Sequence, residues 1–403
     1  MMRNFNKSKP LVVHLDINSC FATIEQQANP LLRGKPIVVA AYNFPGGCIL
    51  TASIEAKKLG IKTGMRVKDG KLICPKLIVL IPDPNKYRVV HKKLYNLLSK
   101  FSEKVIPKSI DEFVFKLINP NTYFFVIKEI KKRIKLEIGE WITVSVGIST
   151  NRYLAKVAAS LIKPDGLVEI NKDNYQLVFS KLKLTDLTGI KKRNEGRLKS
   201  VGIKTVLDFY ESPIWKLKLA FGGITGLYWH TRLHGYEVDD FESKRCMFGN
   251  SYAPPFDKSN MPLEILSKLC QKTGFRLRKA NLKANGIHLA LEARDGNFWH
   301  MGKKISKELF ESGDIYKEAV KLLILSPIKT SFKNIAVSVF DLTEKSILQL
   351  EIFDDVLRKE DLSKSLDKIN EKWGNFYIHP ARMIKIKESI KDRISFGSLD
   401  QIY

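Results

Sequence analysis

Two adjacent carboxylates, Asp111 and Glu112, lie between Lys104–Lys108 and the strand-like segment Phe113–Leu117. A regular strand points successive side chains to opposite faces, so both acids can serve one ion only at a tight bend between two strands. Such a pair, joined by a third carboxylate, suits a two-metal phosphoryl-transfer centre, because closely spaced cations require several anionic oxygens. An isolated Asp-Glu pair is more often a solvated acidic turn. The rest of the chain must therefore supply the third carboxylate.

Asp16 is the candidate for that third carboxylate. It follows the apolar segment Leu11–Leu15, which predicts a buried strand, and it precedes Phe21, Ile24 and Ala28 at helical spacing. An acid at the carboxyl end of a central strand, where the chain turns into a helix, is well placed for a site. A helix cap explains Asp16 equally well when the residue is considered alone.

The charge of the chain indicates a polyanionic partner. Its 403 residues carry 68 Lys and Arg against 42 Asp and Glu, a formal charge of +26. Nucleic acid is the first candidate for such a partner. An anionic membrane would also suit a basic surface, but no uninterrupted apolar segment approaches the roughly 20 residues of a spanning helix. The start of the chain also lacks the apolar core of a signal peptide.

Five widely spaced cysteines form neither a C-x-x-C pair nor a zinc pattern. Reduced thiols in a cytosol are the expected state, and we expect a cytoplasmic protein. The length allows two to four domains with substantial cores.

Strands and helices alternate as far as Lys163, which predicts a mixed α/β catalytic domain. Apolar spacing predicts strands at Leu77–Pro82 and Thr143–Ile148, and a helix over Asn151–Lys163. A largely helical stretch then extends to about residue 236. Within it, Leu187–Ile190 followed by Arg197–Ile203 is typical of a helix–hairpin–helix. Such a unit holds a DNA phosphate through backbone N–H groups without reading sequence.

Residues 237–250 are polar and charged, and we expect a linker there. Beyond it, Ile287–Ala293 and Ile335–Phe340 alternate with period 2, and Leu263–Lys279 is predicted to be a helix. Arg276 and Arg278 belong to a basic cluster before the first of these strands. We expect a small α+β domain with one sheet face open to nucleic-acid phosphates. The alternative is a face that is only solubilising.

Several motifs in one order now resemble the Y-family translesion DNA polymerases. The matching segments are Asp16 to Phe21, Thr51-Ala-Ser-x-Glu-Ala-Lys57, Ser109-Ile-Asp-Glu112, Val144-Ser-Val-Gly-Ile-Ser149-x-Asn151, Lys156 and Lys163-Pro-x-Gly166. Each motif alone is weak, whereas all of them in this order are highly specific.

The resemblance implies a right-hand polymerase with α/β and α+β parts. It implies a palm at residues 10–30 and 77–166, fingers at 31–76, and a thumb with a helix–hairpin–helix at 167–236. A linker at 237–250, a little finger at 251–345 and a tail at 346–403 would follow. DNA binding is then expected at Gly189 and Ile190 in the thumb, and at Arg276 and Arg278 in the little finger.

For the site, the resemblance implies that Asp16, Asp111 and Glu112 hold two Mg²⁺ ions, with the carbonyl of Ile17 assisting. Phe21 matches the steric gate, whose ring lies where a ribose 2′-hydroxyl would have to fit; a core aromatic is the simpler alternative. Thr51, Lys57 and Lys163 match positions that contact the triphosphate, where a hydroxyl and two ammonium groups offset phosphate charge.

This chain departs from the family pattern at several positions. Ile54 and Lys57 stand where the fingers helix usually carries Tyr and Arg. A lysine keeps the charge but loses the bidentate fork of arginine, so triphosphate binding would be weaker or would use another residue such as Lys58. Asn18 stands where Asp is common, and Lys191 stands where a second glycine of the thumb hairpin is typical.

Gln349-Leu-Glu-Ile-Phe353 is similar to the short peptide that docks in the pocket of a bacterial sliding clamp. Two apolar anchors and a glutamine hydrogen bond would make that contact. The clamp-binding residues are then Gln349, Leu350, Ile352 and Phe353.

The sequence thus predicts a DNA-directed DNA polymerase, acting as a monomer on primer-template DNA and dNTP, with two Mg²⁺ ions, low fidelity and a role past damaged template bases. Three alternatives remain open. They are a catalytically idle polymerase homologue that acts as a scaffold at the clamp, a nucleotide cyclase with a palm-like fold, and a DNA-binding structural protein.

Overall fold

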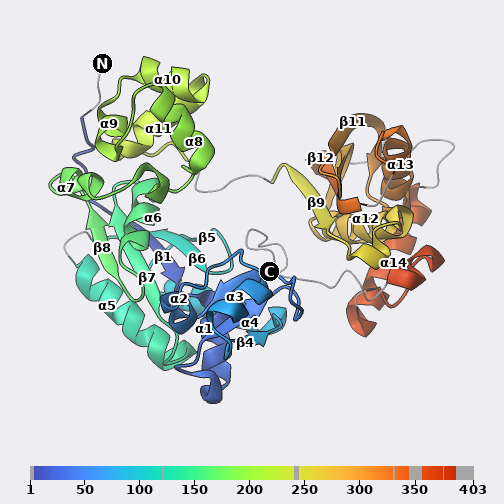
Figure 1. Cartoon of the computed structure of the whole chain (residues 1–403), viewed down its shortest axis with the longest axis horizontal. Helices are drawn as coiled ribbons and strands as arrows, with labels where there is room; N and C mark the ends of the chain where they lie inside the picture. Colours follow the sequence, from blue (N-terminus) through green and yellow to red (C-terminus); the bar gives the residue numbers. More distant parts are fainter. Residues whose placement is uncertain are drawn as a thin grey trace. The chain divides into compact units, whose positions relative to one another are not determined.

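The computed structural model describes residues 4–119, 122–239, 245–329, 332–344, 356–374 and 376–386 (Figure 1). The described residues up to 239 form one compact unit, and those from 245 onward form a second. The change of unit falls inside the segment 237–250 that the sequence marks as a linker.

A five-stranded sheet organises the first unit, with β1 as its middle strand. β1 pairs antiparallel with β6 on one side and with β7 on the other, and β7 pairs parallel with β8. β5 lies at the outer edge beside β6. The strands, in sheet order, are β5 (Val105–Pro107), β6 (Glu112–Lys116), β1 (Val12–Ile17), β7 (Val144–Ser149) and β8 (Leu167–Ile170).

Alternation along β1 gives the sheet two different faces. Val13, Leu15 and Ile17 belong to the main core, together with apolar side chains of three helices. Those helices are α1 (Cys20–Ala28), α4 (Pro84–Leu98) and α5 (Tyr123–Arg133), and α5 continues as the π-helical turn η2 (Ile134–Ile138). The opposite face is covered by α6 (Arg152–Leu161), which packs on β7, β1 and β8. The predicted strand at 143–148 and the predicted helix at 151–163 are confirmed.

Gly147 allows α6 to lie close to the sheet. A Cβ atom at this position would overlap the carbonyl oxygen of Ala155 and the amide nitrogen of Ala159, both in the backbone of α6. Asn151 caps the helix by accepting a hydrogen bond from the backbone N–H of Leu154, at 2.8 Å. The position of α6 is therefore fixed by backbone contact with β7.

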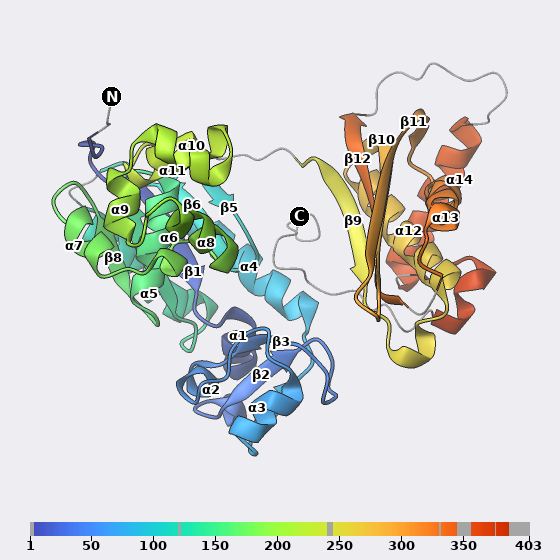
Figure 2. The same ribbon diagram turned by 45° about the horizontal axis from the view of Figure 1, so that its top comes forward.

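A smaller three-stranded sheet forms a separate lobe of this unit, which Figure 2 shows around β2 and β3 with α2 and α3. β4 pairs parallel with β2, so the strand expected at Leu77–Pro82 belongs to this small sheet. The residues expected to begin the second palm segment at 77 thus pair with a strand of the segment expected to form the fingers. The elements are η1 (Pro30–Leu32), β2 (Ile37–Ala40), β3 (Ile49–Ala52), α2 (Ile54–Lys58), α3 (Val67–Ile73) and β4 (Ile78–Leu80).

Helices follow β8 as far as Leu233, as the sequence predicts. Gly189 has a φ of +89°, a conformation that favours glycine, directly before α8. Lys191 has a φ of −120°, which any residue adopts, so the lysine at this position does not disturb the turn. The elements are α7 (Tyr175–Ser180), η3 (Leu184–Asp186), α8 (Lys192–Ser200), α9 (Val206–Glu211), α10 (Ile214–Phe221) and α11 (Ile224–Leu233).

The second unit is built on a four-stranded antiparallel sheet of order β11-β10-β12-β9, against which α12 and α13 pack (Figure 2). β9 begins at Met247, so the last residues of the expected linker are strand instead. The elements are β9 (Met247–Tyr252), η4 (Phe256–Lys258), α12 (Pro262–Lys279), β10 (Leu282–Ala293), β11 (Phe298–Leu309), α13 (Ser312–Leu325), β12 (Phe332–Glu344), α14 (Val356–Trp373) and η5 (Ala381–Ile386). The clamp-like peptide Gln349–Phe353 lies outside the described residues.

Within the part of the chain that the structure describes, none of the helices is long and apolar enough to cross a membrane. Among the described residues, the five cysteines form no disulfide bond with one another.

Substituting Gly147 by Ala is expected to destabilise the first unit by about 2 kcal/mol, because α6 must move away from β7 to admit the new methyl group. Urea unfolding of the full chain measures this loss. Gly196→Ala is the matched control, because Gly196 is exposed on α8 with nothing near the added Cβ. That control should gain up to about 1 kcal/mol from helix propensity. Equal stability of Gly147→Ala and the parent chain would contradict the close packing.

Candidate active site

The predicted bend between two strands is confirmed, and it brings Glu112 opposite Asp16. β5 ends at Pro107 and β6 begins at Glu112, so Asp111 lies at the end of the connecting turn. In the antiparallel pair, Asp16 on β1 and Glu112 on β6 are direct partners. Direct partners share a face of the sheet, and this face is the one that α6 covers.

Short hydrogen bonds hold the turn that carries Asp111. The Ser109 hydroxyl donates to Oδ1 of Asp111 at 2.5 Å, and the backbone N–H of Ile17 donates to the Asp111 carbonyl at 2.9 Å. Beneath the turn, Nδ1 of the buried His91 lies 2.9 Å from the carbonyl oxygen of Ile110. His91 could not be recognised from the sequence, because its hydrogen-bond partner lies 19 residues further along the chain.

Two lysines neutralise the paired carboxylates. Nζ of Lys156 donates to both carboxylate oxygens of Glu112, at 2.8 and 2.7 Å. Nζ of Lys163 donates to Oδ1 of Asp16 at 2.7 Å. Each acid thus has an ammonium partner from a different segment, one on α6 and the other just after it.

Burial and charge set the protonation of the three acids differently. Burial raises the pKa of Asp111 to about 6, and the charges of Asp16 and Glu112 act in the same direction. Burial also raises the pKa of Asp16, although the Lys163 ammonium opposes it. Burial would raise the pKa of Glu112 too, but the charges of His14, Lys156 and Lys163, with the hydrogen bonds from Lys156, hold that pKa below its ordinary value. Glu112 is therefore the most firmly ionised acid of the site.

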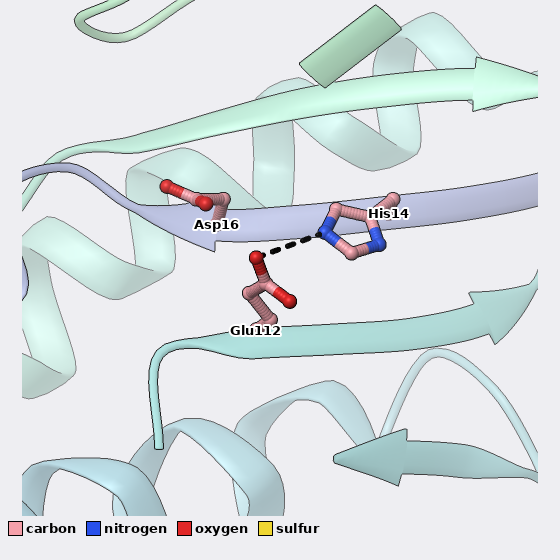
Figure 3. Close-up of side chains that lie close together, drawn as sticks. All are labelled: His14, Asp16 and Glu112. Atoms are coloured by element: carbon pink, nitrogen blue, oxygen red, sulfur yellow. Dashed lines mark ion pairs between the residues drawn. The ribbon is translucent and has the colours of Figure 1, made fainter. Parts of the chain in front are cut away.

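His14 is a further site residue that the sequence did not reveal. It precedes Asp16 by two positions on β1 and so faces the same side of the sheet. Its Nε2 lies 3.9 Å from Oε1 of Glu112, and Figure 3 shows the two side chains facing each other across the strands. Neither ring nitrogen has a hydrogen-bond partner among the described residues, and burial lowers the pKa of His14 to about 4. The imidazole is thus neutral at pH 7.

The residues predicted to bind a nucleotide line a single pocket beside the carboxylates. Its volume is about 440 Å³, and its walls include Thr51, Lys57 and Lys163 together with Asp16 and Asp111. Burial lowers the pKa of Lys57, and Lys163 acts in the same direction while the two acids oppose it. The pocket thus places a hydroxyl and two amino groups next to the acids. Its other lining residues include Ile17, Ile54 and Lys58.

Phe21 lies in the main core, only 1% exposed, and stacks on Tyr87 with ring centroids 4.4 Å apart. The residues that line the pocket include its neighbours Ser19 and Cys20, which directly precede it. The ring itself belongs to the core and is not among the residues that line the pocket, so its role as a gate stays a prediction.

Asn18 explains how the chain uses an amide where the family often has an acid. Its Nδ2 donates to the Ser145 hydroxyl at 2.9 Å, and its Oδ1 accepts a hydrogen bond from the backbone N–H of Asp165 at 2.8 Å. A carboxylate could accept the second bond but could not donate the first. Asn18 therefore ties the end of β1 to the turn that follows Lys163.

The residues predicted to bind DNA are in different situations. Gly189 forms the turn before α8. The side chain of Ile190 beside it is fully buried, so a contact of Ile190 with DNA would involve only its backbone. In the second unit, Arg276 donates from Nη1 to the carbonyl oxygen of Gly249 at 3.0 Å. Arg278 makes a bidentate pair with Asp367 of α14, at 2.7 and 2.8 Å. The contact of both arginines with DNA stays a prediction, and Arg278 already has an internal partner.

Asp16 and Glu112 offer the carboxylate oxygens that Mg²⁺ prefers, and their ligand atoms lie with a ring nitrogen of His14 within 4.8 Å of one another. Asp111 is not part of this group of close ligand atoms, although it lines the adjoining pocket with Asp16. The lysines already place positive charge at two of these carboxylates, which supports a cation-binding role. With the phosphate-sized pocket alongside, the arrangement can bind a polyphosphate next to a cluster of acids.

Comparison with known proteins agrees with this arrangement. The family described as impB/mucB/samB matches residues 15–160, and its C-terminal domain matches residues 243–352. DNA polymerase IV of Pelotomaculum thermopropionicum is 30% identical over 375 residues, covering 90% of this chain and 92% of the relative. DNA polymerase IV 1 of Bacillus subtilis strain 168 is 28% identical over 401 residues, covering 96% of both chains.

Solved structures of Y-family DNA polymerases share the fold. A Y-family DNA polymerase chimera of Dbh and Dpo4 has a TM-score of 0.73 at 25% identity, covering 83% of this chain and 100% of its own. An insertion ternary complex of Dbh DNA polymerase has a TM-score of 0.59 at 26% identity, with the same two coverages. The predicted fold class is confirmed.

Replacing His14 by Leu is expected to stabilise the first unit, and more so in acid. At pH 7 the change removes a buried polar ring without partners, a gain of about 1 kcal/mol. A folded-state pKa near 4 against about 6.5 in the unfolded chain means that the unfolded state binds more protons between these values. The parent chain should therefore lose about 3 kcal/mol relative to His14→Leu as the pH falls from 6.5 to 4.

Urea unfolding of both proteins at several pH values measures this difference. The neighbouring acids titrate in both chains, so their contribution largely cancels in the comparison. A stability difference that does not change with pH would show that His14 protonates as freely as in the unfolded state.

Proposed function

Since this chain belongs to the Y family of DNA polymerases and is a DNA-directed DNA polymerase, we propose that it extends primers past damaged template bases by two-metal phosphoryl transfer, with low fidelity. One observation carries the proposal. Asp16 and Glu112 are direct partners on adjacent strands, beside a pocket of about 440 Å³ lined by Thr51, Lys57 and Lys163.

Asp16, Asp111 and Glu112, with the carbonyl of Ile17, would hold two Mg²⁺ ions. When bound, such ions activate the primer 3′-hydroxyl and neutralise the triphosphate and the leaving pyrophosphate. The chain supplies ionised oxygens for this purpose. Glu112 is kept charged by Lys156, and the turn that carries Asp111 is fixed by the hydrogen bonds of Ser109 and of the Ile17 backbone.

Thr51, Lys57 and Lys163 bind the triphosphate of the incoming dNTP in this proposal. Lys57 belongs to α2, which packs on the small sheet, and Lys163 follows α6, which packs on the five-stranded sheet. Both line the pocket. Two ammonium groups and a hydroxyl would offset phosphate charge. Lys57 keeps charge without the fork of an arginine, and Lys58 lines the same pocket as a further cation.

Primer-template DNA is the proposed polymer substrate. The formal charge of +26 favours it, and one similar solved structure is described as an insertion ternary complex of a DNA polymerase. The turn at Gly189 and Ile190 is the proposed phosphate contact of the thumb, although the N–H of Ile190 already donates to the carbonyl oxygen of Leu187 at 3.0 Å. Arg276 and Arg278 are the proposed DNA contacts of the second unit. Low fidelity and a role in damage tolerance follow from the family.

Phe21 is the proposed steric gate. It directly follows Ser19 and Cys20 of the pocket wall in the sequence, and its ring stacks on Tyr87 in the core, which restrains it. A rigid ring can exclude a ribose 2′-hydroxyl that a flexible side chain would accommodate.

Further proposals concern the protein partners of the enzyme and its location in the cell. The peptide Gln349–Phe353 binds a sliding clamp, the enzyme acts as a monomer, and it works in the cytoplasm. A catalytically idle scaffold at the clamp is the alternative function. The complete set of three acids, with a cation-lined pocket beside them, disfavours it.

Substituting Glu112 by Gln or Asp111 by Asn is expected to reduce primer extension by about a thousandfold, because several kcal/mol of transition-state stabilisation depend on each charge. Extension opposite an abasic site and opposite undamaged template, with and without Mg²⁺, measures the loss, while DNA binding should persist. Glu140→Gln is the control, because Glu140 is an exposed acid whose ion-pair partner is Arg33. Full extension by either acid variant would exclude the site.

Replacing Phe21 by Leu should admit ribonucleotides, since a smaller side chain opens space for the 2′-hydroxyl. The measurement is the ratio of ribonucleotide to deoxyribonucleotide insertion. Phe115→Leu is the control, because Phe115 is an equally buried core ring on β6. If both variants select sugars like the parent chain, Phe21 is only a core residue.

Deleting Gln349–Phe353 should abolish stimulation by a bacterial sliding clamp and leave clamp-free synthesis unchanged. Gel-based primer extension with and without clamp measures both. Retained stimulation would assign the peptide another role.

A further inference from the structure

The ammonium group of Lys156 occupies the carboxylate oxygens of Glu112 that a metal ion would bind. Its Nζ lies 2.8 Å from Oε1 and 2.7 Å from Oε2, so one ammonium group engages both oxygens of the carboxylate. Lys163 similarly engages Oδ1 of Asp16 at 2.7 Å. An ammonium group and a divalent ion at the same two oxygens repel each other, so each weakens the binding of the other.

The surroundings of Glu112 make Lys156 its main source of positive charge. His14 lies further from Glu112 than Lys156 does, with its Nε2 3.9 Å from Oε1, and the ammonium group of Lys163 is engaged by Asp16. Glu112 is only 19% exposed, and it faces Asp16 across the strand pair. A half-buried carboxylate beside a second acid is costly to keep ionised without a cation.

Lys156 is also placed so that it can leave. It lies on α6, whose distance from the sheet is fixed by Gly147. The helix therefore keeps its position when a metal ion binds, and only the side chain of Lys156 can move. The side chain of Lys156 is 36% exposed, whereas its helix neighbours Ala155 and Val157 are buried. Rotation of the side chain into solvent therefore exposes an ammonium group that is already partly hydrated.

We propose that Lys156 is a positioning residue that holds the carboxylate of Glu112 in place in the metal-free enzyme and gives up its oxygens when metal binds. The inference rests on the proposed function, in which Glu112 holds a metal ion. Lys156 competes with the metal, and Lys163 does the same at Asp16. The free enzyme thus binds divalent ions weakly, and binding strengthens when a triphosphate draws Lys163 away from Asp16.

The test measures Mn²⁺ binding to the full chain without DNA or nucleotide, by the electron paramagnetic resonance signal of free Mn²⁺. Lys156→Gln should bind Mn²⁺ about three- to tenfold more tightly than the parent chain, because a competing positive charge is gone. Lys156→Met should give the same gain. Lys156→Arg keeps the charge and should bind Mn²⁺ as the parent chain does. Circular dichroism checks that each variant is folded.

Lys199→Gln is the matched control. Lys199 makes an ion pair of 2.7 Å with Glu195 on α8, so the same charge is lost from a similar pair elsewhere in the unit. Its Mn²⁺ affinity should equal that of the parent chain. A purely structural role for Lys156 predicts weaker or unchanged Mn²⁺ binding in Lys156→Gln and Lys156→Met, and either result would overturn the inference.

Glu112→Gln and Asp16→Asn separate this inference from the proposed function. Both should lose most Mn²⁺ binding. If they bind Mn²⁺ like the parent chain, the proposed metal site itself is wrong. If they lose binding while the neutral variants of Lys156 gain none, the metal site stands and only the competition by Lys156 is excluded.

Discussion

Antiparallel pairing of β1 with β6 places Asp16 opposite Glu112, and a slip of one residue would turn every side chain of β1 to the other face. The same register sends Val13, Leu15 and Ile17 into the main core. A slip would turn Asp16 into the apolar core and would turn Val13, Leu15 and Ile17 toward the face that α6 covers. The hydrophobic core and the alignment of the acids are therefore one constraint.

Internal charge balance is the second requirement of this arrangement. The site contains three partly buried acids, and their negative charges are compensated in different ways. Asp16 and Glu112 have ammonium partners, whereas the pKa of Asp111 rises to about 6 because burial and its acidic neighbours favour its protonated form. The carboxylate oxygens of the site are thus paired with lysines of the protein itself, and further lysines line the pocket beside it.

Local patterns in the sequence predicted the bend at Asp111, the strand before Asp16 and the α6 helix, because each depends on neighbours along the chain. His14 and His91 could not be predicted, since an isolated histidine acquires its meaning from strands and turns distant in sequence. The pairing of β4 with β2 was likewise beyond local periodicity, which identifies a strand but not its sheet. β11 was missed because its mostly exposed side chains give no alternating pattern.

The pair between Arg278 and Asp367 has a consequence for shortened versions of the chain. It ties α14 to α12, and beyond α14 the side chains of Met383 and Ile386 are fully buried, with Ile386 in the core of the second unit. A chain cut before residue 356 would leave Arg278 without its carboxylate and open that core to water. Residues 356–386 therefore belong to the folded unit, and truncation there removes part of a domain.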